Sequence, residues 1–305
     1  MDVALMLEGQ DGLNWARWRR IALAAEEMGF AGLYRSDHFS NPDGPHLDAL
    51  DLWTSLTWLA TATKRIEFGP LVSPVSFRNP VVTAWTAAAV DDLSGGRLQL
   101  GMGAGWQERE HRSLGFDLLG VKDRFARFEE GLRVTTQLLR SDVPSAFDGR
   151  FYHLEDALLL PRPARPCGPP IVIGGNGPKL TLPLTAAYAD EWNAVFVTAE
   201  TFAGLSRQLD DLLTRRGRHP GDVRRTLMTR IVVAKTEAEA ARKLGSDPEA
   251  LRAKGGLIGT PDRIVADLVT LAEAGVQRVM LQWLELDDLD GIEYLATSVL
   301  PQLSA

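Results

Sequence analysis

The chain has little of the chemistry that disulfide-linked and metal-binding proteins use. It has one cysteine in 305 residues, Cys167, which excludes a disulfide or a multi-cysteine metal site within one chain. No G-x-S-x-G motif is present, which argues against a serine hydrolase of the α/β type. The histidines form no H-x-H or H-E-x-x-H pair, so no metal ligands are expected among His38, His46, His111, His153 and His219.

The sequence also lacks an excess of basic residues and any long apolar run. Its 33 Lys and Arg residues are outnumbered by 40 Asp and Glu residues, for a formal net charge of −7. This balance argues against nucleic acid as a partner, because neutralising phosphates requires a clustered basic face. Asp2 stands where a signal peptide carries positive charge, and no window approaches the roughly 18 apolar residues of a membrane span. We therefore expect a cytoplasmic protein without a membrane partner.

Short apolar runs alternate along the chain with longer segments of helical period. The apolar runs predict strands at residues 3–7, 31–35, 66–72, 97–102, 171–173, 192–197, 227–234 and 278–283. The first helix is expected to follow Asn14, a candidate N-cap, and to end at Gly29. The other helical segments cover 49–62, 81–93, 125–139, 180–188, a stretch through 213, 237–251, 262–274 and a last one to about 303.

The order of these elements predicts an α/β protein. The strands are apolar without alternation, which indicates burial on both faces and is typical of a parallel sheet. Eight strand–helix units in about 300 residues favour a single (β/α)8 TIM barrel over a doubly wound sheet. We expect one barrel domain over residues 1–305, with an insertion between the fourth and fifth strands that contains a hairpin around residues 147–151.

In such a barrel, functional groups lie on the loops after the carboxyl ends of the strands. After the second strand, Asp37 and His38 place a carboxylate beside an imidazole, a pair suited to acid–base chemistry. The alternative is an aspartate that caps a loop beside a solvated histidine. The loop after the fourth strand either admits a flat ring or relieves crowding between strands; it consists of Gly103, Ala104, Gly105 and Trp106.

The loop after the fifth strand predicts a phosphate site. Its residues are Gly174, Gly175, Asn176 and Gly177, and Pro178 then begins a helix whose free N–H groups point outward. The spacing matches neither a Walker loop nor the dinucleotide fingerprint, and an ordinary turn is the alternative. A metal-free site with glycine-rich loops and aromatic residues suits a planar organic cofactor.

Several blocks spread over nearly the whole chain form a combined pattern. They cover residues 36–39, 69–80, 93–106 with Glu108, Glu110 and His111, 124–130, 173–177, 189–193 and 259–261. Together they resemble the luciferase-like monooxygenase superfamily, and the part from Gly-Arg-Leu to Gly-Trp is the most specific. The resemblance implies a barrel that binds FMN or the 5-deazaflavin coenzyme F420. The Gly103–Trp106 block and the chain length resemble the F420-dependent branch, which carries a hydride between the deazaflavin and a small organic substrate.

The resemblance also implies roles for individual residues. His38 would face the reactive ring carbon and orient the substrate, and Asp37 would contact the edge of the ring. Leu71 and Val72 match the position of a non-prolyl cis peptide that supports the ring, with Ser73 beside it. The loop from Gly103 to Trp106 would line the ring, while the glycines of the fifth-strand loop and Asn176 would hold the phosphate. The resemblance further implies a homodimer.

Two positions depart from the deazaflavin sugar-phosphate dehydrogenases of the superfamily. Those enzymes carry a catalytic glutamate where this chain has Trp106, and an aromatic residue where it has Pro42. Trp106 enlarges the apolar wall of the site and favours a less polar substrate. Arg78 and Lys179 are candidate partners for the carboxylates of the cofactor tail, although solvation explains both cations equally well.

The sequence thus predicts an F420-dependent oxidoreductase that transfers a hydride to or from a small organic substrate. The first alternative is an FMN-dependent luciferase-like monooxygenase that activates oxygen. A non-catalytic flavin-binding barrel is the alternative from another class.

Overall fold

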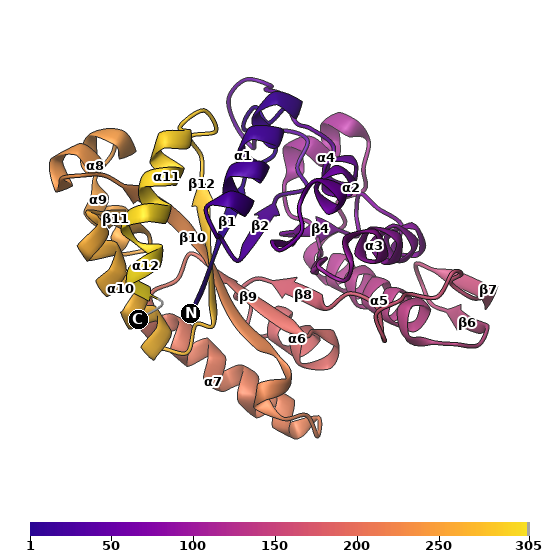
Figure 1. The fold of residues 1–305 in the computed structure, drawn as a ribbon. Helices are drawn as coiled ribbons and strands as arrows, with labels where there is room; N and C mark the ends of the chain where they lie inside the picture. The colour runs from indigo at the N-terminus through magenta and orange to yellow at the C-terminus, as the bar shows by residue number, and fades with distance from the viewer. Residues whose placement is uncertain (304–305) are drawn as a thin grey trace.

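The computed structural model describes residues 1–303, and a ten-stranded sheet lies at its centre (Figure 1). Its strands pair in the order β3-β2-β1-β12-β10-β9-β8-β5-β4, with β11 added to β10, and every pairing is parallel. The strands are β1 (Asp2–Leu7), β2 (Gly32–Arg35), β3 (Glu67–Pro70), β4 (Ser73–Pro74), β5 (Leu100–Gly103), β8 (Ile171–Gly174), β9 (Glu191–Val195), β10 (Arg224–Val233), β11 (Leu257–Gly259) and β12 (Arg278–Trp283).

The sheet is nearly closed into a barrel. The two ends of the strand order, β3 and β4, are neighbours in the chain and are separated only by Leu71 and Val72, whose peptide bond is cis. Phe68 of β3 also forms a parallel bridge with Leu98, just before β5. This confirms the expected TIM barrel; β3 and β4 together take the place of the predicted strand 66–72.

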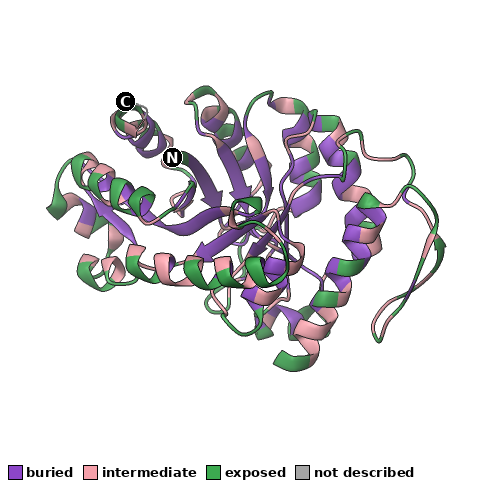
Figure 2. Ribbon diagram, turned by 90° about the horizontal axis from the view of Figure 1, so that it is seen from below, coloured by how far each residue is buried: buried purple, intermediate pink, exposed green. Residues whose placement is uncertain are grey.

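Helices surround the barrel, with their buried faces toward the strands (Figure 2). Asn14 Oδ1 accepts a hydrogen bond from Arg17 N and caps the first helix, and Gly29 follows the helix at φ 84°, both as expected. The helices are α1 (Trp15–Glu27), α2 (Leu52–Ala62), α3 (Pro80–Ser94), α4 (Glu108–Leu114), α5 (Val121–Arg140), α6 (Thr181–Tyr188), α7 (Ala199–Arg215), α8 (Glu237–Leu244), α9 (Pro248–Arg252), α10 (Pro261–Glu273), α11 (Leu289–Ser298) and α12 (Leu300–Leu303), with a short 3₁₀ turn at Pro220–Asp222.

Burial on both faces of the strands explains their continuous apolar sequence. One large cluster fills the layer between strands and helices, with Trp18 and Phe68 fully buried in it. A smaller cluster lies inside the barrel and includes Met6, Met228 and Met280. The strands therefore have no solvent-facing side that would require polar residues.

Two local expectations were wrong, and one strand was not predicted. Residues 237–251 form two helices, α8 and α9, because Gly245 adopts φ 69° and ends the first of them. The predicted last helix is divided into α11 and α12 near Pro301, a residue that has no N–H for a helical hydrogen bond. The short strand β11 had not been expected; it adds to β10 through Leu257–Gly259.

Between β5 and β8 the chain adds α4 and a hairpin to the single helix α5. The hairpin consists of antiparallel β6 (Ser145–Asp148) and β7 (His153–Ala157), where the sequence predicted it. Figure 1 shows it projecting from the side of the barrel beside α5. Over residues 1–303, no helix is both long and apolar enough to span a membrane.

Candidate active site

A cavity of about 510 Å³ opens at the carboxyl ends of the barrel strands. Its volume lies within the range of small-molecule sites, and loops after most of the barrel strands line it. The predicted site residues that line it are His38, Leu71, Val72, Gly103, Ala104, Gly105, Trp106, Gly174 and Gly175. Asp37, Ser73, Asn176 and Gly177 are not among its lining residues.

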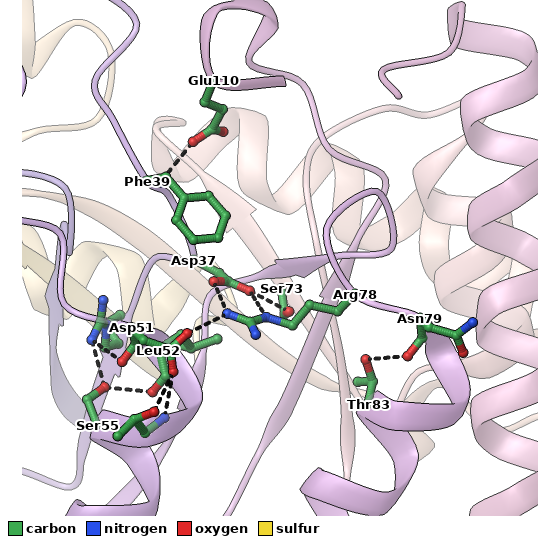
Figure 3. Close-up of polar contacts among 12 residues, drawn as sticks. Asp37, Phe39, Asp51, Leu52, Ser55, Ser73, Arg78, Asn79, Thr83 and Glu110 are labelled. Carbon is green, nitrogen blue, oxygen red and sulfur yellow. Dashed lines mark hydrogen bonds and ion pairs between the residues drawn. The ribbon is translucent and has the colours of Figure 1, made fainter. Parts of the chain in front are cut away.

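His38 is paired with a carboxylate from the segment after β5. Its Nδ1 lies 2.6 Å from Glu110 Oε1. Phe39 N donates to the other carboxylate oxygen, Glu110 Oε2, at 3.0 Å (Figure 3). Glu110 is fully buried in α4, and the side chain of Gln107 caps that helix by accepting from Glu110 N. Within residues 1–303 no hydrogen bond engages His38 Nε2, so this nitrogen remains free to act on a ligand in the cavity.

The surroundings of His38 raise the pKa of its imidazole. Burial acts to lower the pKa of His38, but the hydrogen bond and the negative charge of Glu110 outweigh burial and raise the pKa above its ordinary value. The pair therefore holds a proton on the imidazole more strongly than an isolated histidine does.

We expect Glu110→Gln to lower the pKa of His38, because burial then acts without the opposing carboxylate. Because its pKa is raised in the folded state, protonated His38 stabilises the fold. This contribution is fully present below about pH 6.5, the ordinary pKa, and is lost as the pH rises through the folded-state pKa. The difference in free energy of unfolding between wild type and Glu110→Gln should therefore become smaller as the pH increases through the folded-state pKa of His38. NMR titration of the imidazole and urea unfolding at several pH values measure both effects.

A matched control lies on the same helix. Glu108 is exposed, so Glu108→Gln should leave the titration of His38 unchanged. A His38 pKa that is the same in Glu110→Gln and in wild type would contradict the assignment of Glu110 as its controlling group.

Trp106 forms the outer wall of the cavity beside His38. The two rings meet edge to face, with centroids 5.6 Å apart and an interplanar angle of 83°. The indole is 59% exposed, although tryptophan is a large apolar side chain. An exposed aromatic residue at the rim of a cavity suits contact with a ligand.

The side chain of Asp37 is engaged by Arg78 and Ser73, so its expected contact with the edge of the ring stays a prediction. The Asp37 carboxylate accepts two hydrogen bonds from Arg78, each at 2.9 Å, and a third from Ser73 Oγ at 2.7 Å (Figure 3). Arg78 also reaches Asp51, the cap of α2. Asp37 and Ser73 therefore tie the loops together below the cavity wall, and Arg78 is not free for the cofactor tail. Lys179 remains exposed.

The side chain of Asn176 fastens the loop after β8 to β9 and does not extend into the cavity. Asn176 Nδ2 donates to Val195 O at 2.7 Å, and its Oδ1 accepts from Val195 N at 2.9 Å. Both ends of the side-chain amide are thus used to attach the loop to β9, and the role of Asn176 at the phosphate stays a prediction. Gly175, at φ 123°, and Gly174 bring the backbone of the loop to the cavity.

Arg124, in the first turns of α5, supplies a cation to the same cavity. No hydrogen bond or ion pair engages its guanidinium within residues 1–303, and its Nε is buried. A partly buried cation without a partner suits an anionic ligand group. With the backbone of Gly175 on the same cavity, the residues present fit the phosphate of a cofactor.

Gly103, the last residue of β5, makes room for the segment with the cis peptide. A Cβ on Gly103 would lie 2.5 Å from Val72 Cγ2, whereas a Cβ on Gly174 would lie 3.4 Å from Val72 Cγ1, which is an ordinary contact. Part of the glycine pattern is therefore explained by packing around Val72, the alternative that the sequence had left open.

Sequence reasoning gave no separate role to Glu110 or Arg124. Both belong to blocks that carry the family resemblance, but nothing in their local pattern indicates a cavity. The only local signal is an acidic residue four positions after Trp106, in the helix that follows the fourth strand.

Comparisons with known proteins agree with this architecture. A model of the luciferase-like monooxygenase family matches residues 3–256. The F420-dependent glucose-6-phosphate dehydrogenase of Kineococcus radiotolerans is 35% identical over a match that covers 52% of this chain and 47% of that protein. In that match the chain spans about half the length of its curated relative. The FMNH(2)-dependent dimethylsulfone monooxygenase of Pseudomonas putida is 24% identical, over 93% of this chain and 86% of that protein.

A solved structure shares the fold over nearly its full length. An F420-dependent secondary alcohol dehydrogenase in complex with an F420-acetone adduct superimposes with a TM-score of 0.86 and 19% identity, covering 99% of this chain and 98% of that one. At this identity the likeness concerns the fold.

Proposed function

The chain belongs to the luciferase-like monooxygenase family, and from this membership we propose that it is an oxidoreductase that transfers a hydride between coenzyme F420 and a small organic substrate. The observation that carries the proposal is the His38–Glu110 pair, which faces a cavity that also contains a glycine-rich loop and a cation, Arg124, without a partner among residues 1–303. The F420-dependent relative supports the choice of cofactor.

The proposed cofactor supplies the hydride acceptor or donor when it is bound. Oxidation of an alcohol removes a hydride from carbon and a proton from oxygen, and leaves a carbonyl. His38 Nε2 takes that proton, while Glu110 holds Nδ1 and fixes the orientation of the ring. In the opposite direction the same nitrogen returns the proton to the carbonyl oxygen. Arg124 and the backbone at Gly175 would bind the phosphate.

The proposed substrate is less polar than a sugar phosphate. Trp106 and Phe196 give the cavity an exposed apolar side. A wall of this kind favours a ketone, an aldehyde or an alcohol with an apolar substituent. The small-molecule substrate and the homodimer remain predictions.

A second candidate function is that of an FMN-dependent monooxygenase. The FMNH(2)-dependent relative favours it, because that match covers most of both chains. The same cavity, phosphate loop and cation would then serve FMN.

The test of the proposal is a cofactor titration of the purified protein. We expect the deazaflavin to bind at least about tenfold more tightly than FMN, a difference of about 1.4 kcal/mol. Fluorescence titration with each oxidised cofactor gives the two dissociation constants, and stopped-flow oxidation of the reduced forms then compares their reactivity. Equal or tighter binding of FMN would favour the monooxygenase instead, and binding of neither would contradict both candidates.

A further inference from the structure

Besides Arg124 Nε, a second buried polar atom at the cavity has no hydrogen-bond partner among residues 1–303. Asn193, on β9, is fully buried and lines the cavity. Its Nδ2 donates to Thr226 Oγ1 at 3.0 Å and to Met280 Sδ at 3.4 Å, but no described residue donates to its Oδ1. A buried carbonyl oxygen without a donor costs about 1–3 kcal/mol, so its presence at a ligand cavity requires an explanation.

Neighbouring acceptors fix the orientation of this amide. The Thr226 hydroxyl donates its single hydrogen to Trp192 O at 3.0 Å, so it can only accept from Asn193. Met280 Sδ is likewise an acceptor. A flipped amide would place Oδ1 against these two acceptors, so the orientation with Oδ1 unpaired is the favoured one.

The surroundings of Asn193 define the shape of the group that would reach it. Its register partner on β8 is Gly174, which has no side chain to cover it from that side. Met6, Val195 and Met228 are among the other residues of the cavity wall, and all three are apolar. A complementary ligand is therefore apolar where it meets these residues and carries an N–H or O–H donor that reaches Asn193 Oδ1.

We propose that Asn193 Oδ1 accepts the imide N–H at the pyrimidine edge of the cofactor, so that the tricyclic ring enters the barrel with this edge first. The inference rests on the proposed function, since it assumes a flavin or deazaflavin in this cavity. Both cofactors carry the same imide between two carbonyl groups, so Asn193 recognises the ring system without distinguishing between them. The bound N–H satisfies the acceptor that the protein leaves unpaired.

The test measures binding without turnover. Wild type is titrated by fluorescence with deazaflavin mononucleotide and FMN, each in its parent form and as the imide N-methyl derivative. We expect methylation to weaken binding of each by at least about tenfold. In Asn193→Ala, which removes the acceptor and leaves room for the methyl group, the methylated ligand should bind at least as tightly as the parent.

Thr229→Val is the matched control, because Thr229 is equally buried on β10 and donates to Gly255 O at 2.8 Å, away from the cavity. It should keep the wild-type preference for the parent ligands. Equal affinity of wild type for parent and methylated forms would overturn the inference but leave the proposed function intact. Should Asn193→Ala fail to fold, the wild-type comparison alone decides. Binding of neither nucleotide by wild type would overturn the proposed function itself.

Discussion

His38→Ala should lower the turnover of a deazaflavin-dependent reaction by about 10²- to 10⁴-fold, roughly 3 to 5 kcal/mol, while cofactor affinity changes much less. The reason is that hydride transfer to or from oxygen-bearing carbon also moves a proton, and His38 Nε2 is the free nitrogen of the His38–Glu110 pair at the cavity. Loss of a group that acts on the transferred proton lowers kcat, whereas loss of a binding contact raises the dissociation constant.

The measurement is oxidation of reduced cofactor with a panel of ketones, enones and aldehydes over pH 5 to about 9. His153→Ala is a suitable control, because His153 is also paired with a carboxylate, Asp148, but lies on the exposed hairpin. It should keep wild-type rates. If His38→Ala retains the rate and the pH profile of wild type, the catalytic assignment is wrong; if His38→Asn keeps the rate but binds cofactor weakly, His38 packs against the ring.

Gly69→Ala should destabilise the fold by more than about 4 kcal/mol or prevent folding. Gly69 lies in β3, where the barrel closes against the residues before β5. A Cβ at this position would lie 1.9 Å from Gln99 O, a backbone atom that cannot move without opening the sheet. Moving Gln99 would also break the neighbouring backbone hydrogen bond between the two segments, which Gln99 N donates to Phe68 O at 2.8 Å.

Urea unfolding followed by circular dichroism measures this effect. Gly204→Ala provides the control, because Gly204 lies within α7 and a Cβ there would meet nothing within 4 Å. That substitution should stabilise the protein by about 0.5–1 kcal/mol, since alanine favours a helix interior. A Gly69→Ala variant as stable as wild type would show that β3 and the segment before β5 do not approach this closely.

The barrel was predictable because most of its strands and helices follow from sequence patterns within a few residues. The period of the apolar residues separates strands from helices, and two-sided burial removes polar residues from strands such as β1 and β12. Asn14 and Gly29 act on neighbouring backbone groups, so their capping roles follow from sequence alone. Gly245 is a helix-ending residue of the same kind as Gly29. The apolar residues on both sides of it keep the helical period, however, so the pattern predicted one continuous helix.

The pairing of side chains at the site was not predictable in the same way. Asp37 and His38 are adjacent in sequence, yet Asp37 turns to Arg78 and His38 turns to Glu110, which is 72 positions away. Adjacent residues at the end of a strand point to opposite sides of the sheet, so neighbours in sequence are seldom neighbours in a site. The carboxylate next to the imidazole in sequence was therefore the wrong partner.

The sequence by itself determined the alternation of elements, their approximate ends and the loops that meet at one end of the barrel, because these depend on interactions within a few residues. Only the tertiary structure decided which polar side chains form hydrogen bonds with other residues and which face the cavity without such a partner among the described residues. Arg78 and Asn176 are engaged by partners far along the chain, while Arg124 and Asn193 have polar atoms without a partner in the described part of the chain. Those outcomes depend on where closure of the barrel places distant strands, and no local pattern of residues encodes that distance.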